Sequence, residues 1–296
     1  MNRIVNLAAA ACLSMVLAQA AAADDVDRRL DAAAAGTVSV ENTAGSIVVE
    51  GWSRSEVQVT GELGRDVEEL IFERDGNLTK VHVHTRRRSG RAIDTDLVIR
   101  VPRGSTLNVG GVSIDIEVSG VRGSQRLSTV SGDVESQVFE ADVDVETVSG
   151  DINLHGDEKG ARAKLTSVSG DVEVRELGGE IEMSSVSGDL LIAGGKWSRV
   201  SANTTSGDLD FEAELRPNGR LDVETINGDL DVIFNGRLSA EFDVETFNGN
   251  IKNCFGPKAT KTSRYAPGRE LRFTEGDGDG RVTIRTLNGD LSLCKD

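Results

Sequence analysis

The stretch Thr129-Val130-Ser131-Gly132-Asp133 decides the fold, because close variants of it recur through the second half of the chain. Each variant reads Thr or Ser, usually an apolar residue, then Ser or Asn, Gly, and Asp or Asn. The glycines of the eight copies are Gly132, Gly150, Gly170, Gly188, Gly207, Gly228, Gly249 and Gly289. Successive glycines are 18, 20, 18, 19, 21, 21 and 40 residues apart, which indicates a repeating unit of about 20 residues.

Apolar residues lie seven and five positions before each glycine and usually two and four after it, as Leu221, Val223, Leu230 and Val232 do around Gly228. A period of two is typical of β-strands. The inward-facing parity changes between the Thr or Ser three positions before the glycine and the apolar residue that follows it, which predicts a corner. Glycine suits a sharp bend because it accepts a positive φ angle.

Two arrangements fit a unit of two short strands and two turns. In an antiparallel meander, Asn-Gly pairs would form two-residue hairpins. In a β-solenoid each unit is one coil, and equivalent residues stack on the next coil about 4.8 Å away. Stacking explains why the same residue types keep the same places, so we favour the second. The predicted fold is all-β, a parallel β-solenoid of roughly 20-residue coils with an irregular N-terminal β cap.

The repeat pattern also predicts how the chain is divided. We expect a short N-terminal segment at 24–35, an irregular β cap continuous with the solenoid at 36–110, and solenoid repeats at 111–296. The long gap after Gly249 holds either a degenerate coil or an excursion near 255–285, and we prefer the excursion. Within it, Glu270 to Thr274 and Arg281 to Thr286 look like the two strands of a hairpin.

Residues 1–23 are typical of a signal peptide, with Arg3, an apolar run from Ile4 to Leu17 and small residues up to Ala23. No later stretch reaches the 18 or more apolar residues of a spanning helix, so we expect no transmembrane segment in the mature chain. The expected location is outside the cytoplasm, with the periplasm favoured and the cell surface or secretion as alternatives.

The formal charge of −16 disfavours nucleic acid as a partner, because neutralising phosphates requires a basic face. The sequence contains no Gly-x-Ser-x-Gly, His-Glu-x-x-His or Walker motif. Carboxylates are too numerous to single out a catalytic pair, and 4% aromatic residues leave few rings to line a sugar groove. We therefore assign no catalytic residue and no cofactor.

The repeat and its flanks resemble the bacterial DUF4097 family, also called the putative adhesin family. The resemblance covers roughly residues 36–294 and rests on Glu50-Gly51-Trp52, Glu56-Val57, Val101-Pro102 and the run of Ser/Asn-Gly-Asp turns. It implies a β-solenoid-like exported or envelope protein and brings no catalytic residues.

Cys254 and Cys294 are the two cysteines that remain after the predicted signal peptide, and an exported protein favours pairing. Each lies five residues after a repeat glycine. If the intervening segment loops out, the two occupy matching positions on neighbouring strands, close enough for a disulfide. If a full coil intervenes, they lie about 10 Å apart, too far to bridge.

Three features invite a metal-binding interpretation. One is a ladder of turn aspartates at Asp133, Asp151, Asp171, Asp189, Asp208, Asp229 and Asp290, which could bind Ca²⁺. The ladder lacks the spacing of known calcium solenoids, so we interpret it as solvated turns. The Glu275 to Gly280 loop begins like an EF-hand but fails at Arg281, and His82 and His84 share a strand face without a third ligand. We assign no metal site.

The one basic cluster of the sequence consists of Arg86, Arg87, Arg88 and Arg91, and we name it as a candidate contact for an anionic envelope polymer or lipid headgroup. The predicted function is a non-catalytic envelope protein that presents an adhesin-like binding surface, with an unidentified envelope protein or polysaccharide as partner. Two alternatives stay open: a periplasmic structural or stress-associated scaffold that binds other proteins, and a polysaccharide-acting β-solenoid enzyme.

Overall fold

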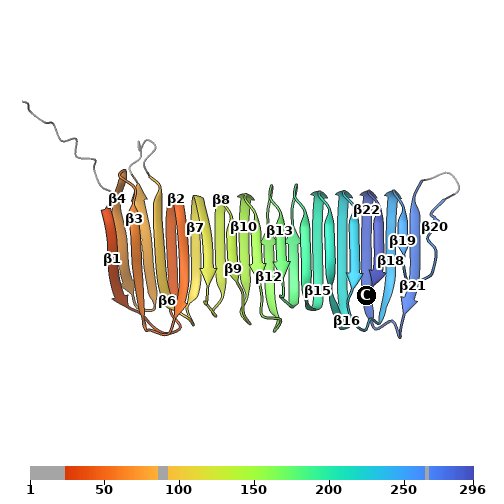
Figure 1. Ribbon diagram of the computed structural model, residues 1–296, viewed down its shortest axis with the longest axis horizontal. Coiled ribbons are helices and arrows are strands. Elements are labelled where there is room, and N and C mark those ends of the chain that lie inside the picture. Colours follow the sequence, from red (N-terminus) through yellow and green to blue (C-terminus); the bar gives the residue numbers. More distant parts are fainter. Residues whose placement is uncertain (1–23, 86–92, 264–266) are drawn as a thin grey trace, which may run out of the picture.

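The computed structural model describes residues 24–85, 93–263 and 267–296, and every regular element in these ranges is a strand. Figure 1 shows the strands stacked side by side in one elongated body, with β1 (Asp24–Asp31) at one end and β21 (Arg269–Glu275) near the other. Among the described residues, no helix is long and apolar enough to cross a membrane.

Each coil contributes one strand to each of two layers. Sheet 1 holds the strand before the repeat glycine, and sheet 2 holds the strand after it. In one coil these are β10 (Val143–Ser149) and β11 (Ile152–His155). The coils on either side are β8 (Gln125–Ser131) with β9 (Val134–Gln137), and β12 (Ala161–Thr166) with β13 (Val172–Arg175). All these neighbours pair in parallel, which confirms the solenoid and excludes the meander.

Further along the stack, single strands bend from one sheet into the other. The strands of this region are β14 (Gly179–Ser184), β15 (Leu190–Ser206), β16 (Leu209–Asn227) and β17 (Leu230–Phe234). β15 begins in sheet 2, where Leu190 pairs with Val172, and ends in sheet 1, where Ser201 pairs with Glu182.

Alternate residues of the two sheets meet in one continuous apolar core. Trp197, Phe211 and Phe234 are its largest fully buried side chains, and valines, leucines and isoleucines fill the rest. Burying one aliphatic side chain stabilises the fold by about 1.5–3 kcal/mol. The period-two pattern therefore accounts for a core made without helices.

At the N-terminal end, the first coil in sequence is not the first in space. β2 (Thr37–Trp52) lies between β7 (Thr106–Ser119) and the coil formed by β5 (Leu78–Thr85) and β6 (Thr95–Pro102), pairing in parallel with all three. Regular coils thus begin at Thr37, inside the range expected to be an irregular cap. The antiparallel strands that cover this end are β1, β3 (Glu56–Leu63) and β4 (Val67–Asp75).

The C-terminal end shows the same kind of inversion. β22 (Gly280–Asn288) and β23 (Leu291–Lys295) insert between the β16–β17 coil and the coil of β18 (Ala240–Asn248) and β19 (Ile251–Asn253). In Figure 1, β22 accordingly appears between β16 and β18. The last coil in the sequence therefore lies between two coils that come before it in the sequence.

The predicted hairpin between Glu270–Thr274 and Arg281–Thr286 is wrong, because β18 lies between these segments. β21 pairs antiparallel with one edge of β18, and β22 pairs in parallel with the other. Stacking of the Phe273 ring on Phe242, with centroids 4.4 Å apart, favours the pairing with β18. The short β20 (Thr260–Lys261) then pairs with β21.

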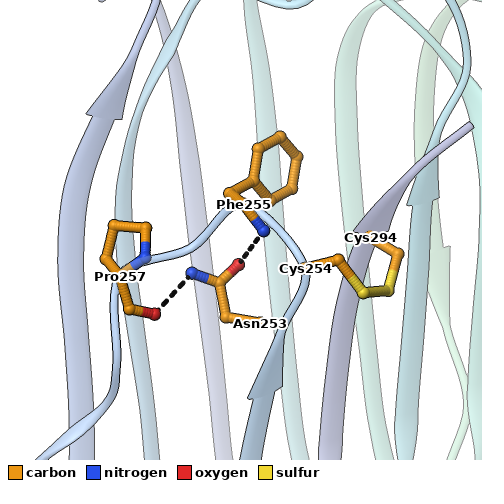
Figure 2. Close-up of a disulfide and its surroundings, with 5 residues drawn as sticks. All are labelled: Asn253, Cys254, Phe255, Pro257 and Cys294. Carbon is orange, nitrogen blue, oxygen red and sulfur yellow. Dashed lines mark hydrogen bonds between the residues drawn. A yellow bond between two sulfur atoms is a disulfide. The ribbon is translucent and has the colours of Figure 1, made fainter.

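The insertion brings Cys254, directly after β19, beside Cys294 of β23, and the two form a disulfide with Cα atoms 4.8 Å apart. Figure 2 shows this bridge beside a turn held by Asn253, whose side chain accepts a hydrogen bond from the Phe255 N–H and donates one to the Pro257 carbonyl. The bridge therefore fastens the inserted coil to the outer one.

Candidate functional site

The corner between the two sheets repeats in every regular coil, and its glycines allow the coils to stack closely. A Cβ atom on Gly150 would lie 2.0 Å from the Gly132 carbonyl oxygen, and one on Gly188 would lie 2.1 Å from that of Gly170. Gly150 and Gly188 also have φ angles of 154° and 149°, a region that side chains disfavour. The spatial order of the turn glycines is Gly132, Gly150, Gly170, Gly188, Gly207, Gly228, Gly289 and Gly249.

The turn aspartates form a chain of hydrogen bonds beside the glycines. The backbone N–H of Asp151 donates to Oδ1 of Asp133 at 2.9 Å, and that of Asp189 donates to Oδ1 of Asp171 at 2.8 Å. The chain ends where the Asn250 N–H donates to Oδ1 of Asp290 at 2.8 Å. One oxygen of each carboxylate is thus engaged by the next coil, which favours the interpretation as structural turns over a row of calcium ligands.

In eight coils an apolar side chain points into solvent just before the corner. We call this row the corner stripe. Its members are 41 to 51% exposed, and they are Val112, Val130, Val148, Val168, Val186, Ile226, Leu287 and Phe247. Thr205 takes the same position in one coil and interrupts the row. At the strand spacing of about 4.8 Å, nine stacked coils give a stripe roughly 40 Å long.

The corner stripe deepens into a groove at its C-terminal end. The groove has a volume of about 460 Å³, and its lining includes Ile226, Leu287 and Phe247 from three successive coils. The Arg285 guanidinium lies on the rim, with Nη1 3.3 Å from Oε1 of Glu224. The Arg285 charge is therefore already paired, and the aliphatic side chains are the feature of the groove that a partner would cover.

The corner stripe was not predicted from the sequence, although the sequence contained the signal for it. The change in which alternate residues face inward located the corner, and the apolar residue directly after that change had to face outward. Thr205 divides the stripe into runs of five and three apolar side chains, and exposed apolar patches of this kind are uncommon on monomeric soluble proteins. An apolar residue at this position in eight coils is the signal that identifies the stripe as a surface feature.

The Glu275–Gly280 loop is organised around a protein hydroxyl. The backbone N–H groups of Asp277 and Gly278 both donate to Oγ of Ser239 at 3.1 Å. This favours the interpretation as a turn, because a cation site needs oxygen atoms that point toward its centre. Here backbone N–H groups converge on the Ser239 hydroxyl instead. Within the ranges that the structure describes, no three His, Cys, Asp or Glu side chains are grouped to hold a metal.

His82 and His84 lie on the outer face of β5 with their rings stacked, centroids 4.2 Å apart, and Nδ1 of His82 is 3.2 Å from Oε2 of Glu41. The pair therefore belongs to the surface of the N-terminal end, far along the stack from the groove. The candidate polymer contact at Arg86, Arg87, Arg88 and Arg91 lies outside the described residues.

A second, acidic groove of about 330 Å³ lies on the outer face of sheet 2, with Asp210 and Asp231 on paired positions of neighbouring coils. Partial burial, with the nearby carboxylates of Asp231, Asp208 and Asp189, raises the pKa of Asp210 above its ordinary value of 3.8. The groove thus carries carboxylates that repel one another around Asp210, and Lys252 also contributes to its lining.

These features define a parallel two-sheet β-solenoid with a stacked Gly-Asp corner. The chain belongs to the family described as Toastrack DUF4097, whose profile matches residues 15–178 and 176–294. The family match and the solenoid fold agree with the resemblance seen in the sequence.

The matches among solved structures have low sequence identity. A putative lipid binding protein from Parabacteroides distasonis is 13% identical with a TM-score of 0.50, over 92% of this chain and 97% of that one. A putative adhesin from Bacteroides fragilis is 12% identical with a TM-score of 0.41, over 91% and 97%. A putative adhesin from Parabacteroides distasonis is 10% identical with a TM-score of 0.35, over 93% and 98%. None of the curated proteins matches.

Proposed function

We propose that this chain is an exported, non-catalytic repeat protein whose corner stripe binds another protein of the cell envelope. The observation that carries the proposal is the row of eight half-exposed apolar side chains along one edge of a rigid stack. Keeping such a row in water costs solubility and invites association, so it is best explained by a partner that covers it. The adhesin names of structural relatives agree with a binding role.

The chemistry of the corner stripe favours a protein partner over a polysaccharide. Sugar-binding surfaces rely on aromatic rings that stack on the pyranose faces. Phe247 is the single aromatic residue of the stripe, and Trp197 is fully buried in the core. Valine, isoleucine and leucine instead suit the aliphatic side chains of another protein.

The proposed location is the periplasm, with display at the cell surface as the alternative. The Cys254–Cys294 disulfide supports export, because such bonds persist in oxidising compartments. The signal-peptide pattern of residues 1–23 supports the same location. A structural scaffold in the periplasm would use the same corner stripe as an adhesin. The identity of the bound partner distinguishes these two roles.

The test is a pull-down in which the wild-type chain and its variants are immobilised, and the envelope proteins that each retains are compared. Changing Ile226, Leu287 and Phe247 together to Ser should abolish retention of the partner, because it removes the apolar lining of the groove. The matched control is Leu191→Ser, which removes a half-buried aliphatic side chain from the outer face of sheet 2. Equal retention by the triple variant and the wild-type chain would refute the proposal.

A further inference from the structure

Three arginines occupy one row on the outer face of sheet 1. Arg199 pairs in register with Arg220, and Arg220 pairs in register with Arg281. All three side chains are exposed, while the residues that follow them, Val200 and Leu221 among them, are fully buried. The guanidinium groups therefore project from adjacent strands, about 4.8 Å apart at their origins. We call this row the arginine ladder.

The inverted threading of the C-terminal coils creates the arginine ladder. If the coils stacked in sequence order, Glu241 would follow Arg220 and neutralise it. The insertion of β22 instead places Arg281 beside Arg220 and moves Glu241 to the far side of Arg281. The insertion of β22 thus brings three positive charges together and leaves the Glu241 carboxylate at the end of the row.

The charges of the arginine ladder are only partly balanced. Nη2 of Arg281 lies 3.4 Å from Oε2 of Glu241, and Glu180 at the other end pairs with Arg162 at the same distance. Arg199 and Arg220 form no ion pair with any described residue. Like charges directly opposite each other destabilise a sheet, so the pairing of Arg220 with Arg199 and with Arg281 is locally unfavourable unless an anion lies between the guanidinium groups.

We infer that Arg199, Arg220 and Arg281 bind a phosphate group of an envelope component. Guanidinium groups donate paired hydrogen bonds to oxyanions. A phosphate has three or more acceptor oxygens and can bridge two arginines on adjacent strands, whereas the two oxygens of a carboxylate are satisfied by a single arginine. Ser201 and Thr283 flank the ladder on the same face, on either side of Asp222, and add hydroxyl donors. The site lies on a face of the coil, apart from the corner stripe.

Titration calorimetry with sodium tripolyphosphate, and flotation with phosphatidylglycerol vesicles, test the inference on the whole chain. Arg220→Gln removes the central rung and should weaken binding about tenfold or more, since it deletes charge-assisted hydrogen bonds. The control is Arg162→Gln, which removes an ion-paired arginine of the same row and should change affinity by less than about twofold. Binding of wild-type protein should also weaken as salt is raised.

The two probes distinguish the possible sources of the phosphate. Binding of tripolyphosphate alone identifies a soluble phosphate, and binding of vesicles alone identifies a lipid headgroup. Either result supports the inference if the Arg220→Gln variant loses that binding. Failure of both probes to bind, or equal losses for the two variants, overturns it. The Ser substitutions in the corner stripe should leave phosphate binding unchanged, so the failure of one proposal is distinguishable from the failure of the other.

Discussion

At the scale of single residues, the corner glycines and aspartates do separate tasks. Glycine removes the atom that would collide with the coil below, and aspartate supplies an acceptor for the backbone of the coil above. The first task depends on stacking and the second on a hydrogen bond, so substitutions can separate them. Neither task requires a bound ion.

Gly188→Val should destabilise the fold by about 3 kcal/mol or more, because its Cβ would overlap the Gly170 carbonyl oxygen and φ is positive. Gly256→Val is the control: Gly256 has a φ of 114°, and a Cβ there meets nothing within 4 Å. Thermal unfolding should show a clearly larger loss for Gly188→Val. Equal losses would mean that backbone strain alone, without close stacking, explains the glycine.

Asp171 tests the hydrogen-bond chain against a calcium site. Asp171→Asn keeps the Oδ1 acceptor for the Asp189 N–H and should leave the melting temperature nearly unchanged, whereas Asp171→Ala should cost about 0.5–1.5 kcal/mol. Calcium should not shift the melting temperature of either variant or of the wild-type chain. A calcium-dependent rise that both variants lose would show that the carboxylates bind the ion.

Asp210 makes stability depend on pH. Its folded pKa is raised by partial burial and by Asp231, so the ionised form is disfavoured in the folded state. Stability should therefore fall as pH rises from 3.8 through the folded pKa, and no penalty remains below 3.8, where both states bind the proton. Asp210→Asn should raise the melting temperature at pH 7 by about 1–2 °C, and the gain should vanish in acid. A gain that persists at low pH would contradict this cause.

At the scale of elements, the coil was predictable from the sequence and the stacking order was not. Period-two apolar residues and a glycine every 20 or so positions define two strands and a corner within one coil. The order of coils depends on contacts between distant segments, and Gly249 and Gly289 carry nearly identical motifs. The local sequence pattern could not show that β22 lies between β16 and β18. The arginine ladder, which needs that order, was hidden for the same reason.

The disulfide secures this inverted order. Cys254→Ser with Cys294→Ser should lower stability by roughly 3–4 kcal/mol, because the bridge closes a loop of 40 residues. Denaturant unfolding of the double variant measures the loss. Thiol titration of the exported, denatured wild-type protein provides the second check, and two free thiols there would contradict the bridge.

At the scale of the whole molecule, both ends are closed by antiparallel strands while regular coils fill the middle. At one end β3 and β4 pair with β6 and β5, and at the other end β21 pairs with β18, which protects these parallel strands from pairing with other chains. The corner stripe and its groove then remain as the long apolar surface open to a partner.

Photo-crosslinking in intact cells tests the central claim most directly. A photoreactive amino acid replaces Leu287 in the groove, or Leu191 on sheet 2 as the control, and the products are separated by mass after irradiation. We predict an adduct with one envelope protein from position 287 and none from position 191. The absence of an adduct at 287, or the same adducts from both positions, would contradict the proposal that the corner stripe is a binding surface.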